Sequence, residues 1–212
     1  MLFEKPSDDV LHDPTLRDAV ARLLGDIPPK LRGKTLLKAD FIETPIGPMV
    51  AIADDHALHV LEFLERKALA TEVKKLWKAT GSAVVFGRTG PIERIEAELA
   101  AYFAGNSAAF DSRLAPLGTP FERQVWDVLM EIPAGSTSSY SGLAAGMGKP
   151  AAVRAVGRAN GANPIAVVIP CHRVVGAGGE LTGYGGGLWR KRWLLEHERR
   201  MAGSLPRPSR EH

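Results

Sequence analysis

Cysteine is almost absent from this chain of 212 residues: Cys171 is the only one. An internal disulfide and a zinc site built from several cysteines are therefore excluded. No apolar run approaches the roughly 18 to 20 residues that a membrane-spanning helix needs, so we expect no membrane partner. The first residues carry acids and lack a basic start followed by an apolar stretch, which argues against a secretory signal. These absences predict a cytoplasmic protein, and we expect neither a metal site nor a cofactor.

Acidic residues are missing from a long internal stretch. Between Glu131 and Glu180 there is none, although four basic residues fall within it: Lys149, Arg154, Arg158 and Arg173. Residues 119–212 hold 12 basic and 7 acidic residues, a net charge of +5, whereas residues 1–118 hold 15 basic and 17 acidic residues, a net of −2. An acid-free basic segment can accept a polyanion as partner at low cost, because no fixed negative charge repels phosphates. A solvated basic surface is the alternative interpretation.

The first half of the chain has the pattern of an α/β unit. A short N-terminal helix is expected with Asp13 as its cap, Pro14 in its first turn and Gly25 at its end, before a break at Ile27-Pro28-Pro29. Alternating apolar runs separated by turn residues predict strands, and apolar residues at helical spacing predict helices. The expected strands are 35–43, 48–53, 57–63 and 84–86, and the expected helices are 65–79 and 91–104.

The second half is expected to be mainly helical. Thr119, Pro120 and Glu122 form the start signal of a helix, in which Thr119 and Glu122 make a capping box. A short second helix is expected from Ser139 or Ser141 to Gly148, and a third runs from Pro150 to about Asn160. Two short helices joined by a tight turn that contains glycine are typical of a helix-turn-helix.

Reactive chemistry is expected around Cys171, which follows the apolar segment that ends at Pro170. A thiolate is a nucleophile, and the neighbouring His172 and Arg173 are expected to lower the thiol pKa. Adjacent side chains on extended backbone point apart, so contact between Cys171 and His172 requires a bend or a bridging water. A carboxylate should orient the imidazole, and Glu198 on the last helix is the candidate. An inert, buried cysteine remains the alternative.

The sequence resembles the O6-alkylguanine-DNA alkyltransferases. The segment Pro170-Cys171-His172-Arg173-Val174 is the most specific motif. Further matching segments surround it at the right spacing: Ser139-Tyr140, Arg154-Ala155-Val156-Gly157, Asn163-Pro164, Gly183-Tyr184-Gly185-Gly186-Gly187-Leu188 and Leu194-Leu195-Glu196-His197-Glu198. The resemblance is strong over residues 119–199 and weak over 35–118. Arg199 stands where this family commonly has glycine.

The resemblance implies a ribonuclease-H-like α/β domain followed by a mainly helical domain with a helix-turn-helix, acting as a monomer on double-stranded DNA that contains O6-alkylguanine. Such proteins flip the base through the minor groove and transfer its alkyl group to their own cysteine, once per molecule. Carried over, Cys171 is the acceptor, His172 takes its proton through a water, and Glu198 orients His172. Asn163 braces the nearby turn, and Tyr140 contacts the flipped nucleotide. The implied DNA-binding residues are Arg154, which fills the gap left by the base, with Tyr140, Ser139, Ala155, Gly157 and Arg158; Pro170, Tyr184, Gly185 and Gly186 wall the pocket.

These considerations divide the chain into an N-terminal extension (1–34), an α/β domain (35–115), a DNA-binding and alkyl-acceptor domain (116–200) and a tail (201–212). Two other functions compete with alkyl transfer. A cysteine hydrolase would use Cys171, His172 and Glu198 as a triad and would turn over repeatedly. A DNA-binding regulator would need no reactive cysteine.

Overall fold

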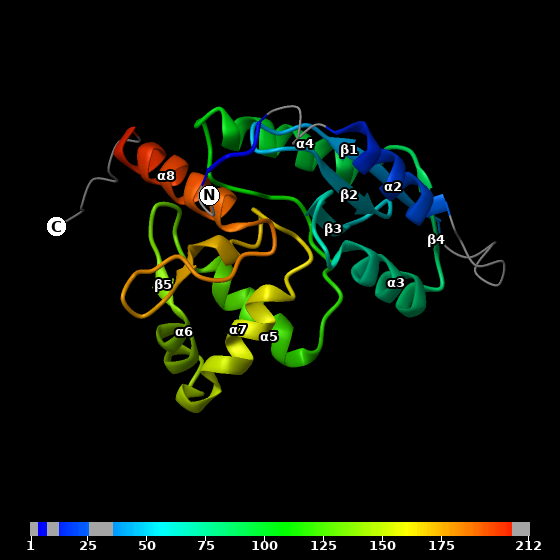
Figure 1. The fold of residues 1–212 in the computed structure, drawn as a ribbon. Coiled ribbons are helices and arrows are strands. Elements are labelled where there is room, and N and C mark those ends of the chain that lie inside the picture. The colour runs from blue at the N-terminus through cyan, green and yellow to red at the C-terminus, as the bar shows by residue number, and fades with distance from the viewer. Residues whose placement is uncertain (1–3, 8–12, 26–35, 205–212) are drawn as a thin grey trace.

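The structure is a computed structural model, and it describes residues 4–7, 13–25 and 36–204. Its first half is built around a four-stranded sheet (Figure 1). The elements in chain order are α2 (Pro14–Gly25), β1 (Leu36–Ile42), β2 (Met49–Ala53), β3 (Leu58–Phe63), α3 (Leu69–Thr80), β4 (Ala83–Phe86) and α4 (Gly90–Phe103). All the strands and helices predicted for this half are present. The break expected at Ile27-Pro28-Pro29 lies outside the described residues.

The strand order is β3-β2-β1-β4. β1 pairs with β2 and β2 with β3 in antiparallel fashion, whereas β4 runs parallel to β1. One face of the sheet is covered by α2 and α3, whose apolar residues join a cluster with Val50 and Ile52. The other face packs against α4 and the second half of the chain. β2 and β3 are buried along their whole length because both of their faces are covered.

The N-terminal α2 begins as the sequence predicts. The Asp13 carboxylate accepts a hydrogen bond from the Thr15 amide at 2.9 Å, which caps the first turn. Val20 and Leu24 are buried in the cluster on this face of the sheet. The helix therefore belongs to the packed structure.

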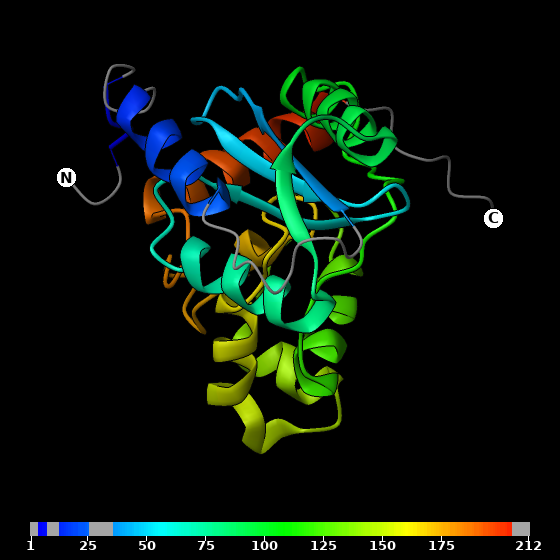
Figure 2. The same ribbon diagram turned by 90° about the vertical axis from the view of Figure 1, so that its right-hand side faces the viewer.

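The second half is mainly helical; α5, α6 and α7 extend below the sheet in Figures 1 and 2, whereas α8 lies at the level of the sheet. At its start, Thr119 accepts from the Glu122 amide and Glu122 accepts from the Thr119 amide, which confirms the predicted capping box. A short parallel pair, β5 with β6, was not predicted. The elements are α5 (Pro120–Met130), β5 (Ser138–Ser139), α6 (Tyr140–Gly146), the 3₁₀ turn η2 (Pro150–Ala152), α7 (Val153–Gly161), the 3₁₀ turn η3 (Cys171–Arg173), β6 (Val174–Val175) and α8 (Leu188–Ser204).

The two halves share one hydrophobic core. Its largest cluster joins sheet residues such as Phe63 to Trp126 of α5 and Leu194 of α8. The backbone of Leu61 in β3 also exchanges hydrogen bonds with Pro164 and Ala166 at 2.9 and 2.8 Å. A boundary near residue 116 thus separates two halves in sequence, while their cores are continuous in space.

Two limits differ from the predicted ones. α8 continues to Ser204, beyond the limit of 200 given to the second domain, because Met201 is still buried in the core. Residues 205–212 of the predicted tail lie outside the described residues. α3 begins at Leu69, since residues 65–68 form a turn after β3. In the described ranges 4–7, 13–25 and 36–204, no helix is both long and apolar enough to cross a membrane.

Candidate active site around Cys171

Cys171 lies at the start of a tight 3₁₀ turn. Cys171 and His172 do not lie on extended backbone, because Pro170 leads directly into η3 and only Val174 returns to extended conformation. The Arg173 amide donates to the Pro170 carbonyl at 2.9 Å and closes this turn. The backbone therefore bends at the cysteine.

The thiol of Cys171 is held by an asparagine. Asn163 donates from Nδ2 to the sulfur at 3.2 Å and to the Ile169 carbonyl at 2.9 Å. Its Oδ1 accepts from the Ile165 amide at 2.9 Å, which fixes the orientation of the side-chain amide. Asn163 thus braces the turn before the cysteine, in the place expected for it, and also contacts the reactive atom.

Burial controls the acidity of this thiol. Only 5% of Cys171 is exposed. Burial raises the thiol pKa to about 11, because it disfavours the charged thiolate, while the Asn163 hydrogen bond and the charges of Arg66 and Lys191 act in the opposite direction. The expected lowering of this pKa by His172 and Arg173 is wrong. Both side chains form hydrogen bonds with Glu198 instead.

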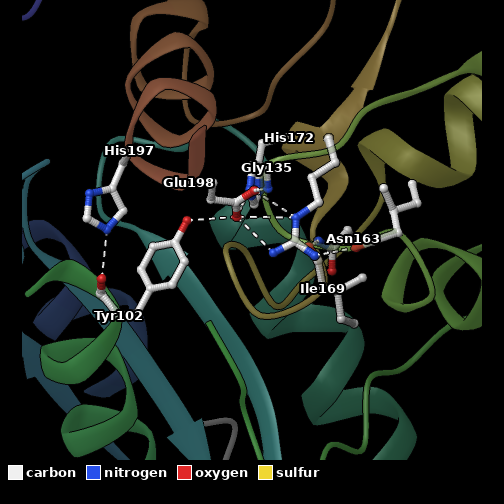
Figure 3. Close-up of polar contacts among 9 residues, drawn as sticks. Tyr102, Gly135, Asn163, Ile169, His172, His197 and Glu198 are labelled. Atoms are coloured by element: carbon white, nitrogen blue, oxygen red, sulfur yellow. Dashed lines mark hydrogen bonds and ion pairs between the residues drawn. The ribbon is translucent and has the colours of Figure 1, made fainter. Parts of the chain in front are cut away.

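His172 and Glu198 form a wholly buried pair (Figure 3). The His172 Nε2 lies 2.8 Å from Glu198 Oε1. A carboxylate only accepts, so Nε2 carries the hydrogen and Nδ1 keeps its lone pair. Nδ1 is buried and has no hydrogen-bond partner among the described residues. The pair predicted from the sequence is thus formed, with one imidazole nitrogen left to accept a proton.

Glu198 is the centre of a larger cluster (Figure 3). Arg173 donates to both of its carboxylate oxygens, at 2.8 Å from Nη2 and 3.0 Å from Nε. Tyr102 of α4 donates its hydroxyl hydrogen at 2.9 Å, and the Gly135 amide donates at 3.1 Å. Burial alone would raise the pKa of Glu198, but the hydrogen bonds from His172 and Arg173 and the positive charge of Arg173 hold it well below its usual value. Glu198 is therefore a carboxylate at any ordinary pH.

His172 is held in its neutral form. Burial lowers its pKa, against the opposing effect of Glu198. A neutral imidazole beside a carboxylate is suited to accept a proton, because the carboxylate stabilises the imidazolium that results. The arrangement can act as a general base.

Sequence reasoning missed three contributors. Tyr102 occupies an ordinary buried position in α4, so no local pattern marks it. Lys191 of α8 is buried with its ammonium donating to the carbonyls of Val174 and Thr182, and burial lowers its pKa to about 8. Arg66, in the turn after β3, donates to the Asn163 carbonyl at 3.0 Å. All three lie far from Cys171 in sequence or in a part of the chain without a motif.

The expected DNA-binding residues lie on α6 and α7. Ser139 caps α6 by accepting from the Gly142 amide at 2.9 Å. The Tyr140 ring lies beside Gly157, where an added Cβ would sit 3.7 Å from the ring. Arg154 and Arg158 are exposed and one helical turn apart on α7, so they share a face. Ala155 and Gly157 are partly exposed between them.

The expected pocket residues line two separate cavities. Tyr184, Gly185 and Gly186 line one of about 450 Å³, together with Arg66 and Arg190. Pro170 lines another of about 500 Å³, on the Phe110 side. Across the described ranges, no group of three or more His, Cys, Asp and Glu side chains could hold a metal ion.

Residues 120–200 match the family model described as 6-O-methylguanine DNA methyltransferase, DNA binding domain. Among curated proteins, a methylated-DNA–protein-cysteine methyltransferase of Salmonella typhimurium is 44% identical over 159 residues, which are 74% of this chain and 92% of the relative. One of Methanosarcina barkeri is 43% identical over 159 residues, 75% of this chain and 95% of the relative.

The chain belongs to the methylated-DNA–protein-cysteine methyltransferase family. The crystal structure of Mycobacterium tuberculosis OGT in complex with DNA resembles it with a TM-score of 0.66 and 42% identity, covering 78% of this chain and 94% of that one. The O6-methylguanine methyltransferase of the same organism gives a TM-score of 0.67 and 41% identity over 81% of this chain and 96% of that one. The mixed α/β architecture is therefore shared with methyltransferases of known structure.

Proposed function

We propose that this protein repairs DNA by direct reversal, transferring the alkyl group of O6-alkylguanine to Cys171. Membership of the methyltransferase family supports the reaction, and the chain offers one cysteine to carry it. The observation that carries the assignment is the placement of that cysteine. Its sulfur accepts a hydrogen bond from the Asn163 side-chain amide, and the next residue in the chain, His172, is paired with Glu198.

In the proposed reaction, the Cys171 thiol gives its proton to His172 Nδ1 through a bridging water. As this proton leaves, the sulfur attacks the alkyl carbon; an S–C bond forms, the C–O6 bond breaks, and the electron pair remains on the guanine. Because burial keeps the thiol pKa near 11, the proton leaves only as the substrate is attacked. Glu198 stabilises the imidazolium that forms on its neighbour. The product is a thioether, so each molecule acts once.

The leaving guanine needs hydrogen-bond donors for the negative charge that develops on it. Tyr140 is placed to supply one, since its hydroxyl already reaches the Thr182 carbonyl at 3.4 Å, next to the Gly183–Gly187 segment. An added Cβ at Gly186 would meet the Phe63 and Tyr184 rings at 2.8 and 2.9 Å. Glycine at this position lets the backbone lie close to both rings. Tyr184, Gly185 and Gly186 then form one wall for the base.

We infer that α6 and α7 form a helix-turn-helix that approaches double-stranded DNA from the minor groove. An alkyl group on O6 within a duplex is out of reach of a protein nucleophile, so the base must be flipped out, which costs a few kcal/mol. Arg154 is exposed on α7 and fills the gap in the stack. The partly exposed Ala155 and Gly157 allow the helix backbone to approach the groove closely. Arg158 and Ser139 contact phosphates.

The proposal extends to the organisation of the chain. The sheet with α3 and α4 corresponds to a ribonuclease-H-like domain over residues 35–115, and residues 116–200 carry DNA binding and alkyl acceptance. Residues 1–34, whose α2 packs on the sheet, precede this domain, and the tail follows α8, which ends at Ser204. We propose that the protein acts as a cytoplasmic monomer.

Intact-mass measurement after incubation with an O6-methylguanine oligonucleotide tests the function. One added methyl per protein, with no further turnover in excess substrate, is the expected result. Repeated turnover of an ester or peptide would instead establish the cysteine hydrolase. An unchanged mass with tight DNA binding would establish the regulator without chemistry.

A further inference from the structure

Arg66 connects the N-terminal half of the protein to the turn that carries Asn163. Its side chain is 6% exposed, and its two terminal nitrogens reach across to α7 and the segment that follows. Nη1 donates to the Asn163 carbonyl at 3.0 Å and Nη2 to the Gly161 carbonyl at 2.9 Å. The planar guanidinium can bind two carbonyls at once, which a lysine cannot do in the same geometry.

Two acidic side chains hold the guanidinium in place. Glu62 at the end of β3 contacts Nη1 and is wholly buried, and Glu72 of α3 lies 2.8 Å from Nη2. Both come from the N-terminal half, as Arg66 does. The three side chains thus form a buried unit that presents its positive centre to the second half of the chain.

The segment held by Arg66 is the one that binds the cysteine. The Asn163 carbonyl accepts from Arg66, while its side-chain amide donates to the Cys171 sulfur at 3.2 Å. A shift of this backbone would therefore move the donor that faces the reacting atom. Backbone hydrogen bonds between Leu61 of β3 and residues Pro164 and Ala166 lie next to the same turn. β3 and Arg66 together therefore fix its position.

Arg66 also acts on the sulfur through its charge. Arg66 and Lys191 favour the thiolate, whereas Glu62 opposes it. Tyr140 and Tyr184 are the other titratable groups close enough to interact with Cys171, and His172 is its neighbour in the chain. Of these two cations, Arg66 is the one that contacts the Asn163 segment directly. It therefore both holds the backbone of this turn and favours the thiolate of Cys171 through its charge.

We propose that Arg66, held by Glu62 and Glu72, is a positioning residue for the alkyl acceptor. It fixes the Asn163 turn and favours the ionised sulfur, which makes the N-terminal half part of the reaction site. This rests on the proposed role of Cys171 as acceptor. It assigns a function to a turn for which the sequence shows no motif.

Arg66→Met, Arg66→Lys and a control, Arg88→Met, test the proposal. Arg88 is half-exposed and pairs with Asp40 and Glu96 within the N-terminal half. The readout is the pH dependence of two rates: alkylation of the only cysteine by iodoacetamide, and transfer from a free O6-alkylguanine base. Thermal unfolding and DNA affinity are measured alongside, so that a general loss of folding is recognised.

Arg66→Met should shift both rate–pH curves toward higher pH by about one unit, which makes the reaction about tenfold slower at neutral pH. Arg66→Lys keeps the charge without the double contact and should give a smaller displacement, and Arg88→Met none. DNA affinity should be unchanged. Curves that overlay the wild type, even with a less stable Arg66→Met protein, would overturn the proposal. Failure of the wild type to take an alkyl group from DNA would contradict the proposed function, while the iodoacetamide curves would still decide the role of Arg66.

Discussion

The Glu198 cluster and the exposed face of α7 hold their charges in opposite ways. Glu198 is fully buried, and Arg173, His172, Tyr102 and the Gly135 amide all donate to it. Arg154 and its neighbour one turn away are exposed, with small residues between them. Buried charges are stable only when paired and hydrogen-bonded, whereas exposed cations stay available for a polyanion.

This difference separates the proposed alkyl-acceptor site from the proposed DNA-binding face. A reacting group must be fixed, so its neighbours come from distant elements and are saturated with contacts. A DNA-facing group must be able to exchange water for phosphate, so it has few protein contacts. Changes in the first region should therefore affect both stability and reaction. Changes in the second should affect DNA binding and repair in the duplex, and leave stability and the reaction with the free base unchanged.

The largest expected effect is that of Cys171→Ser. A hydroxyl is far less acidic than a thiol, and the chain has no second cysteine to take its place. We expect no alkyl adduct by intact mass after incubation with an O6-methylguanine oligonucleotide, and unchanged affinity for the duplex. An adduct on any other residue would contradict the assignment.

Glu198→Gln should come next, because it leaves His172 and Arg173 buried without their carboxylate. We expect a loss of about 3 to 5 kcal/mol in the free energy of unfolding and a severely slowed transfer. The pKa of Glu198 in the folded protein lies below its usual 4.5, so the unfolded chain binds the proton first. Its contribution is complete above about pH 4.5 and is lost as the pH falls further.

Denaturant unfolding between neutral pH and pH 3 checks this second prediction. The wild type should lose stability below about pH 4.5 more steeply than Glu198→Gln. Arg88→Met, which breaks an exposed set of ion pairs, serves as the control and should change stability by no more than about 1 kcal/mol. Parallel curves for the wild type and Glu198→Gln would show that Glu198 does not carry the acid sensitivity.

Arg154→Ala should separate the two regions. We expect repair in duplex DNA to slow by about 10- to 100-fold, because the flipped base is no longer replaced in the stack, and reaction with the free base to be unchanged. Single-turnover rates on both substrates measure this. Arg94→Ala, an exposed arginine of α4, is the control and should leave both rates intact. Equal losses on duplex and free base would place Arg154 in the chemistry instead.

The smallest effect is expected for Arg158→Ala. Each phosphate contact releases counterions on binding. Without this contact, the plot of log affinity against log salt concentration should become less steep by about 1. Titration of a fluorescent duplex at several salt concentrations gives this slope. The unfolding free energy and the reaction with the free base should not change. A slope equal to that of the wild type would remove Arg158 from the DNA interface.

Local patterns predicted much of the fold. The capping box at Thr119 and Glu122, the cap at Ser139 and the alternating strands of the first half all depend on contacts between residues near in sequence, and they formed as expected. Propensity and capping act over one or two turns, so a short window of sequence contains their causes. The His172–Glu198 pair was reached through a longer motif.

Contacts between distant residues were beyond those patterns. The sequence by itself determined that there is one thiol, that His172 and Arg173 follow it, and that the surrounding stretch lacks acids. Only the tertiary structure decided that Arg173 faces Glu198, that Tyr102 of α4 joins them and that Arg66 holds the Asn163 turn. The physical reason is that burial and partner choice set the pKa and position of a charged group, and both depend on which segments the shared core brings together. That is also why the thiol pKa was expected to fall, while its burial raises it.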